Sequence, residues 1–198
     1  MNLYKTFIIT LLIFFFPFKG FSQKVTVHVF MENKTAPETS DTIYYNFDRK
    51  LTWKDFQGKP QPGVPWGAMT ASGFSFNSSI NMDGDNIGIT VGIFTFFIKH
   101  DSWKKPDINS DYHLEHEQHH FDITSLHAQK LLEEIRKANF TSSNIKQLLN
   151  SIFDKANDEN IEMQHEYDLE TKNSMDVQGQ TKWNQKISDE IEKLKDEK

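Results

Sequence analysis

The chain has 198 residues, no cysteine and a formal net charge of −6 at pH 7. Without cysteine it can form no disulfide, supply no thiolate metal ligand and use no cysteine nucleophile. Mild acidity without a strongly basic block argues against nucleic acid as a partner.

The first residues predict a signal peptide. Met1–Lys5 is short and positive, Phe7–Phe18 is an almost unbroken apolar run, and Ser22 is a small residue suited to signal-peptidase cleavage. A membrane span needs about 20 apolar residues, so a retained anchor is the less favoured alternative. We expect residues 1–22 to be removed and residues 23–198 to form a single exported domain, periplasmic or secreted, without stable membrane insertion.

The chain before residue 108 has the character of a β-sheet. Residues 24–31, KVTVHVFM, alternate in the two-residue period of a half-buried strand, and Asp83-Gly84 is a strong hairpin signal. The proline-rich residues 59–67, KPQPGVPWG, predict an irregular loop. Five segments are expected to be strands: 24–31, 42–48, 51–56, 71–80 and 86–98.

After residue 108 the apolar spacing becomes helical. One helix is expected from a cap at Asn109 or Ser110 to about Lys137, a second after the caps at residues 141–143, and a third over about 177–195. Strands first and helices second predict an α+β fold, with an N-terminal antiparallel β-sheet followed by a C-terminal helical half.

The first predicted helix contains His116-Glu117-Gln118-His119-His120, which matches H-E-x-x-H. Residues four apart lie on one helix face, so His116 and His120 can bind the same zinc ion. Glu117 is then placed to take a proton from the water on the metal. The alternative is a polar helix whose histidines bind nothing.

Other histidines of this helix fit the zinc less well. His127 lies seven residues beyond His120, about 10 Å along the axis, which is too far for a bond of about 2 Å. His113 is equally far from His120, and His119 points elsewhere. We expect these side chains at the rim of the site, behind its ligands or on the surface.

Two histidines leave a third protein ligand to be found. The spacing that places a further histidine six residues after the second is absent, because position 126 is leucine. The ligand must therefore come from a later segment, and residues 163–174, MQHEYDLETKNS, are rich in candidates. These candidates are His165, Glu166, Asp168, Glu170 and Asn173.

Several segments together resemble a bacterial family catalogued as domain of unknown function 922, described as predicted secreted zinc-dependent proteases. HEQHHFDI is similar to the core of its zinc helix, LTWKDFQGKP to an upstream element, and SWKK to an element just before the zinc helix. YDLETKNS, with Gln180 and Trp183, is similar to its closing pattern. The resemblance covers roughly residues 51–187 and implies a zincin-like metallopeptidase.

The chain departs from that family at Asn173, where the family pattern has a histidine. If that histidine is a ligand, the site here has lost it, because asparagine binds zinc poorly. Asp168 matches the family motif and is an ordinary zinc ligand, so the resemblance favours His116, His120 and Asp168 as the metal site. Tyr167 would then stabilise the oxyanion, although a core tyrosine is an equal alternative.

Two functions from different classes follow from these patterns. The first is an exported zinc-dependent peptidase that acts on peptide or protein substrates, with Glu117 as general base. The second is a non-catalytic metal-binding module of the envelope, its third ligand lost at Asn173. A structural domain with an accidental motif is the least favoured, because two separate segments match.

Overall fold

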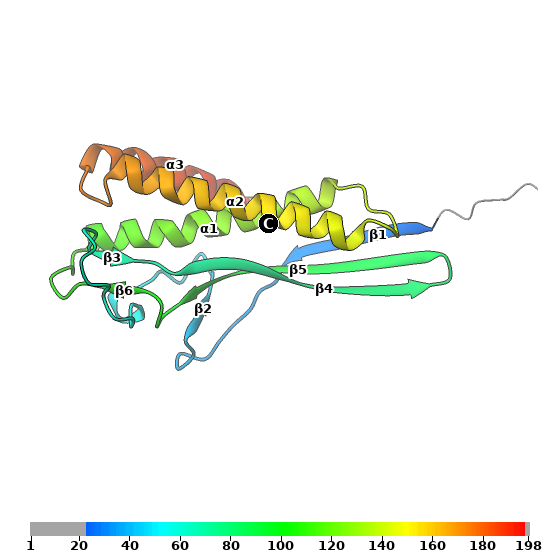
Figure 1. Ribbon diagram of the computed structural model, residues 1–198, viewed down its shortest axis with the longest axis horizontal. Coiled ribbons are helices and arrows are strands. Elements are labelled where there is room, and N and C mark those ends of the chain that lie inside the picture. Colours follow the sequence, from blue (N-terminus) through cyan, green and yellow to red (C-terminus); the bar gives the residue numbers. More distant parts are fainter. Residues whose placement is uncertain (1–22, 197–198) are drawn as a thin grey trace, which may run out of the picture.

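The computed structural model describes residues 23–196. In this part of the chain a mixed β-sheet is followed by three helices, so the predicted α+β class is confirmed. Figure 1 shows the two layers, with the helices lying along one face of the sheet. The predicted signal peptide lies outside the described residues, and no helix among the described residues is both long and apolar enough to span a membrane.

The strands are β1 (Lys24–Met31), β2 (Thr42–Tyr44), β3 (Ala68–Met69), β4 (Ser72–Asp83), β5 (Asn86–Ile98) and β6 (Trp103–Lys104). Three of them, β1, β4 and β5, lie close to the predicted ranges, whereas β2 is shorter than predicted and β3 and β6 were not predicted. The strand predicted at residues 51–56 is wrong, since Trp53–Asp55 is a short 3-10 helix. The Asp55 carboxylate closes this turn by accepting a hydrogen bond from the Thr52 backbone N–H at 2.8 Å.

β5 lies at the centre of the main sheet. It pairs antiparallel with β4, from Ser72 opposite Phe97 to Asp83 opposite Asn86, and antiparallel with β2. β1 pairs with β5 in parallel, so the prediction of an antiparallel sheet is corrected to a mixed one. A tight hairpin fixes the direction of β4 against β5, whereas a long connection leaves the direction of β1 open. β3 and β6 form a separate two-stranded sheet.

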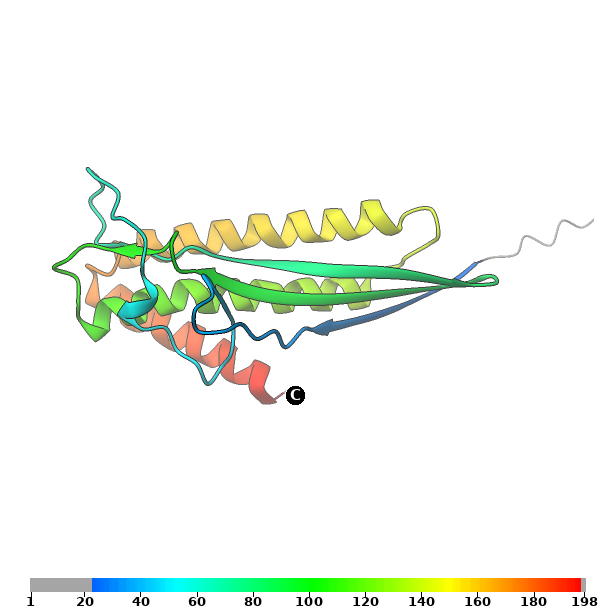
Figure 2. The ribbon, with the colours of Figure 1, turned by 90° about the horizontal axis from the view of Figure 1, so that it is seen from below.

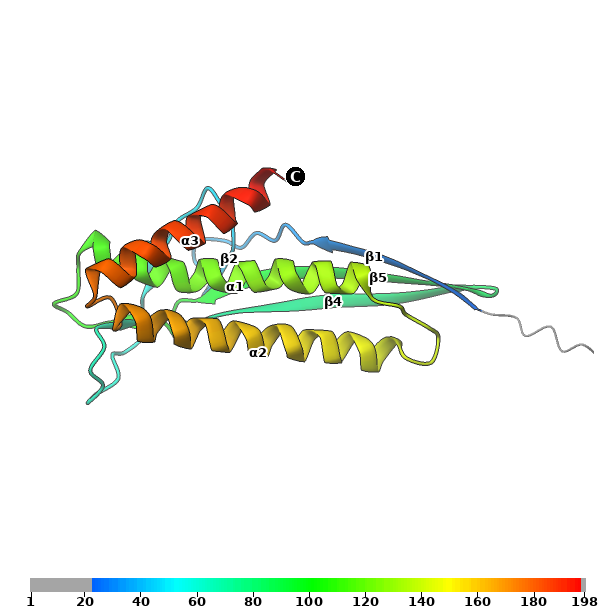
Figure 3. The ribbon, with the colours of Figure 1, turned by 90° about the horizontal axis from the view of Figure 1, so that it is seen from above.

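The three helices are α1 (Asp111–Lys137), α2 (Ile145–Thr171) and α3 (Val177–Asp196), close to the predicted ranges. The Ser110 side chain caps α1 by accepting a hydrogen bond from the His113 backbone N–H. Figure 3 shows α1 between α2 and α3. This arrangement surrounds the first half of α1 with protein on several sides.

The described residues bury three apolar clusters, and α1 contributes to each of them. Ala128, Leu131 and Ile135 of α1 pack against the sheet, which contributes residues such as Ile89 and Val91. Figure 2 shows the β4–β5 hairpin running along this helical layer. A second cluster joins all three helices, through Ile123, Leu126, Tyr167, Trp183, Ile187 and Ile191.

Candidate metal centre

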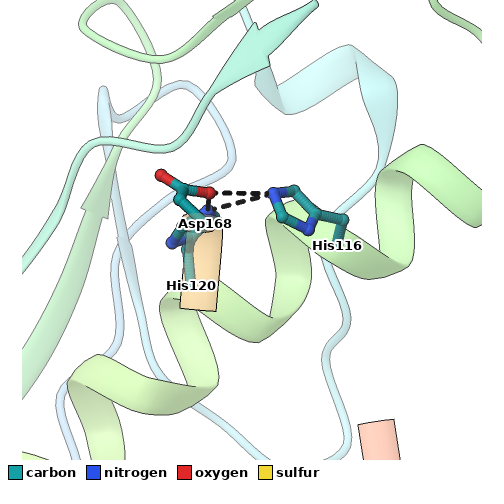
Figure 4. A group of neighbouring side chains, drawn as sticks. All are labelled: His116, His120 and Asp168. Carbon is teal, nitrogen blue, oxygen red and sulfur yellow. Dashed lines mark hydrogen bonds and ion pairs between the residues drawn. The ribbon is translucent and has the colours of Figure 1, made fainter. Parts of the chain in front are cut away.

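Two helices bring together three side chains that could bind a metal ion. His116 and His120 lie one turn apart on α1, and Asp168 lies near the end of α2, which packs beside α1. Figure 4 shows the carboxylate of Asp168 facing the two imidazole rings. The group thus joins residues that are about fifty positions apart in the sequence.

The three donor atoms form a nearly equilateral triangle. Asp168 Oδ1 lies 3.2 Å from His116 Nε2 and 3.1 Å from His120 Nε2, and the two Nε2 atoms are 3.3 Å apart. Ligand atoms about 2.0–2.1 Å from a tetrahedral zinc ion are about 3.3 Å from one another. The nitrogen and oxygen donor set and its spacing therefore fit zinc.

Two glutamine amides orient the histidines. His116 Nδ1 donates to Gln180 Oε1 at 2.9 Å, and His120 Nδ1 donates to Gln164 Oε1 at 2.5 Å. The Nε2 group of Gln180 donates to the Tyr167 hydroxyl, and that of Gln164 to the His120 carbonyl, so each amide oxygen must face its histidine. A proton on each Nδ1 leaves each Nε2 lone pair free for a metal.

The charges of the group are strongly coupled. Burial would raise the pKa of the Asp168 carboxyl, but hydrogen bonds from His116 and His120 outweigh it and hold that pKa well below its usual range. Burial would lower the pKa of His120, but Asp168, with a smaller effect of Glu117, raises it to about 9. A positive charge is therefore favoured among these three side chains, and a bound metal ion would take the place of the proton on Nε2 of His120.

Glu117 lies beside the group and is held in place. Its carboxylate Oε2 accepts a hydrogen bond of 2.7 Å from the Thr70 hydroxyl, directly after β3. The side chain is almost fully buried, yet the residue lines the same cleft as His116, His120 and Asp168. The Glu117 carboxylate can therefore contact a molecule bound in that cleft, although little of the side chain is exposed to solvent.

The cleft has a volume of about 660 Å³ and two distinct walls. One wall is the loop and strand from Pro65 to Thr70, and the other is α2, with Ile161, His165 and Leu169. Ile161 is 58% exposed and Leu169 is 68% exposed, so apolar surface faces the cleft. A site with a polar centre and apolar walls suits a ligand that has apolar groups beside a polar one.

Tyr167 does not lie where the oxyanion role would require it. Its ring is fully buried and stacks on His116, and its hydroxyl donates to the His116 backbone carbonyl at 3.3 Å. The hydroxyl also accepts a hydrogen bond from Gln180. Tyr167 thus holds His116 in place by stacking and hydrogen bonding, as expected for the alternative of a core tyrosine. Its position does not favour the predicted role of stabilising the oxyanion.

The other predicted candidates lie on α2 or in the turn after it, and their side chains point in different directions. Asn173 and His165 line the cleft, although neither joins the three metal-binding side chains. Glu170 instead accepts a hydrogen bond from the Trp183 indole at 2.7 Å, and Glu166 is exposed. The buried group that could hold a metal ion therefore consists of His116, His120 and Asp168.

Of the three positions expected for the neighbouring histidines, the rim and the surface are wrong for His119 and His127, because both are buried. His119 Nδ1 lies 3.1 Å from the buried Asp122 carboxylate, and His127 lies between helices with Nε2 3.3 Å from Met163 Sδ. The long buried stretch of α1 could not be predicted from its sequence, because polar side chains in it bond to residues far away in the chain, as Asp122 does to the Tyr45 hydroxyl at 2.8 Å.

Three residues hold the side chains of the site in place but had no predicted role. Gln164 precedes Asp168 by four residues, so helical spacing could have placed it on the metal-facing side of α2. Gln180 was noted only for its family resemblance. Thr70 carries no local signal, because its partner Glu117 is 47 residues away.

Comparison with known proteins gives one match. No curated protein matches the chain, and no solved structure does either. The model of a family described as bacterial protein of unknown function (DUF922) matches residues 102–179. That segment is shorter than the resemblance seen in the sequence, and it holds His116, Glu117, His120, Gln164 and Asp168. Residues 102–179, which carry the candidate metal group, are therefore similar to the DUF922 family.

Proposed function

We propose that this protein is an exported zinc-dependent peptidase, with His116, His120 and Asp168 as zinc ligands and Glu117 as general base. The observation that carries the proposal is the triangle of three donor atoms in a cleft that Glu117 also lines. Neither a polar helix nor a single buried ion pair needs three donors at the spacing of tetrahedral zinc.

Each residue of the site has a part in amide hydrolysis. Zinc, when bound, would polarise the scissile carbonyl and make a water molecule more acidic. Glu117 takes the proton of the attacking water and returns it to the leaving amine. The hydrogen bond from Thr70 to Oε2 leaves the other carboxylate oxygen, Oε1, for this proton transfer.

The walls of the cleft favour an extended peptide as substrate. β3 pairs with β6 along one edge and has no other strand neighbour among the described residues. Ala68 and Met69 of β3 line the cleft, so a peptide can add to the strand there through main-chain hydrogen bonds. Export places such an enzyme in the periplasm or outside the cell, which we propose from the leader at residues 1–22.

The alternative is a metal-binding module without activity. It was suggested by the loss of a histidine at position 173. The Asp168 carboxylate lies close enough to both histidines to bind the same metal ion, so the site needs no further ligand from Asn173. We therefore favour catalysis.

The proposal is tested by incubating residues 23–198, loaded with zinc, with denatured casein. We expect cleavage products that disappear after chelation and return when zinc is restored. Glu117→Gln should bind zinc as the parent does but lose cleavage by at least about 100-fold, because proton transfer contributes that much or more. Equal cleavage by Glu117→Gln would contradict the proposal.

A further inference from the structure

The turn that follows α2 has an unusual backbone. Lys172, Asn173 and Ser174 have φ values of 49°, 51° and 68°. Non-glycine residues rarely adopt this left-handed conformation, because Cβ crowds the following carbonyl oxygen, and they do so mostly as single residues. Three in succession require that the surroundings impose the conformation.

Contacts on both sides of the turn impose it. The Asn173 backbone N–H donates to the Asp168 carbonyl at 2.9 Å, and the Lys172 ammonium pairs with Asp176 at 2.9 Å. α3 starts directly afterwards and packs against the end of α2. A Cβ on Gly179 would lie only 2.3 Å from the Glu170 carbonyl oxygen. The turn is therefore rigid, and it is tied to the carbonyl of Asp168.

The turn presents Asn173 to the cleft. Asn173 lines the cleft together with His116 and Asp168, whereas Lys172 does not. The Asn173 side chain is exposed and makes no hydrogen bond with another residue that the structure describes. Its amide is thus available to a molecule in the cleft, next to the three metal-binding side chains.

We propose that Asn173 binds the main chain of the substrate. Its amide has a donor and an acceptor, which match the carbonyl and N–H of a peptide group. The turn fixes the backbone of Asn173 at the cleft, so only the two side-chain torsions lose freedom when substrate binds. The inference rests on the proposed peptidase function and adds a substrate-binding residue to it.

Two glycine substitutions separate binding from backbone strain. Glycine adopts the left-handed conformation without cost, so Asn173→Gly and Lys172→Gly should both fold. We expect the Tm of Asn173→Gly to equal that of the parent or exceed it by up to about 4 °C. Lys172→Gly also loses the exposed ion pair with Asp176, and exposed ion pairs contribute little to stability, so its Tm should stay within about 4 °C of that of the parent. Only Asn173→Gly removes a side chain from the cleft, so Lys172→Gly is the matched control.

The kinetic readout is hydrolysis of oxidised insulin B chain by the zinc-loaded protein. We expect Asn173→Gly to raise KM about fivefold, the effect of one neutral hydrogen bond, with kcat and zinc content unchanged. Lys172→Gly should keep the KM of the parent. An unchanged KM in Asn173→Gly would overturn the proposal, and so would a loss of zinc, which would place Asn173 in support of the metal.

A binding measurement keeps this inference separate from the peptidase proposal. The fluorescein-labelled insulin B chain is titrated with each zinc-loaded variant in the Glu117→Gln background, and Kd is read from fluorescence anisotropy. A Kd about fivefold higher for Asn173→Gly than for Lys172→Gly supports the inference even if the parent cleaves nothing. Equal Kd values, or no binding by any variant, would overturn it.

Discussion

Neutral amides, not carboxylates, hold both histidines of the proposed metal site. Gln180 and Gln164 accept the Nδ1 protons of His116 and His120 and add no charge. With Asp168 as the single charged ligand, a zinc site built this way would keep a net positive charge. That charge suits a site that must stabilise negative charge on a carbonyl oxygen.

Thr70 is the residue whose removal best isolates the position of Glu117. Thr70→Val keeps the shape of the side chain but removes the hydroxyl that donates to Glu117 Oε2. A hydrogen bond to a charged group contributes about 1.5–3 kcal/mol, so kcat should fall about 10- to 100-fold. Peptide hydrolysis measured beside zinc content checks this, and zinc content should not change.

Thr70→Ser provides the control, because it restores the hydroxyl. It should recover most of the lost kcat. If Thr70→Val and Thr70→Ser were equally slow, packing by the threonine methyl group and not the hydrogen bond would explain the loss.

Two neighbouring faces of α2 make different contacts, because one faces α1 and the other lines the cleft. Gln164 and Asp168, four residues apart, face α1 and its histidines. Ile161 and Leu169, eight apart, form an exposed apolar wall of the cleft. One helix therefore fixes the distance between the proposed metal site and the proposed substrate-binding surface.

Leu169→Ser tests whether that wall selects the substrate. Removing an apolar contact in a cleft changes binding by about 1–3 kcal/mol, so KM for peptides with apolar side chains should rise at least about fivefold. KM for peptides with polar side chains should change little. Met175→Ser is the matched control, because Met175 is 80% exposed and does not line the cleft. Equal effects of the two substitutions on KM would contradict the assignment.

Elements with strong local signals were predictable from the sequence. The alternation of β1, the Asp83-Gly84 hairpin and the Ser110 cap of α1 all appear where expected. The structure of residues 51–56 was not predictable in this way. Their aromatic composition suggested a strand, whereas the Asp55 carboxylate closes a turn. Local hydrogen bonding by a polar side chain overrode β propensity there.

The molecule as a whole contains features that no local pattern fixes. The parallel pairing of β1 with β5 joins residues about sixty positions apart. The H-E-x-x-H spacing predicted that His116 and His120 share a face, but only the packing of α2 on α1 brings Asp168 to them. The buried position of Tyr167 follows from the same packing, which residue type alone could not reveal.

The stability of the whole fold should depend on pH through His127. Burial lowers the pKa of this imidazole to about 4, so the folded protein holds it neutral. Above about pH 6.5 the His127 imidazole is neutral in both the folded and the unfolded protein, so its protonation does not lower the free energy of unfolding. Between about pH 6.5 and 4 the unfolded chain binds a proton that the folded chain excludes, so stability falls as pH falls.

His127→Leu removes this group from a buried position of similar size. Between pH 7 and 4.5, with chelator present, the Tm of the parent should fall about 5 °C further than the Tm of His127→Leu. This difference corresponds to about 2 kcal/mol in the free energy of unfolding. His120, whose pKa is raised, and Asp168, whose pKa is lowered, are present in both proteins, so their contributions to the pH dependence cancel in the comparison. Parallel Tm curves for parent and variant would show that His127 is not responsible.

Zinc per chain, measured by elemental analysis on residues 23–198, tests the proposed metal centre most directly. The parent and Glu117→Gln should each hold close to one zinc ion per chain. His120→Ala and Asp168→Ala should lose it while remaining folded by circular dichroism. A parent that binds no zinc even after it is added, or an Asp168→Ala variant that keeps it fully, would contradict the proposed three-ligand site.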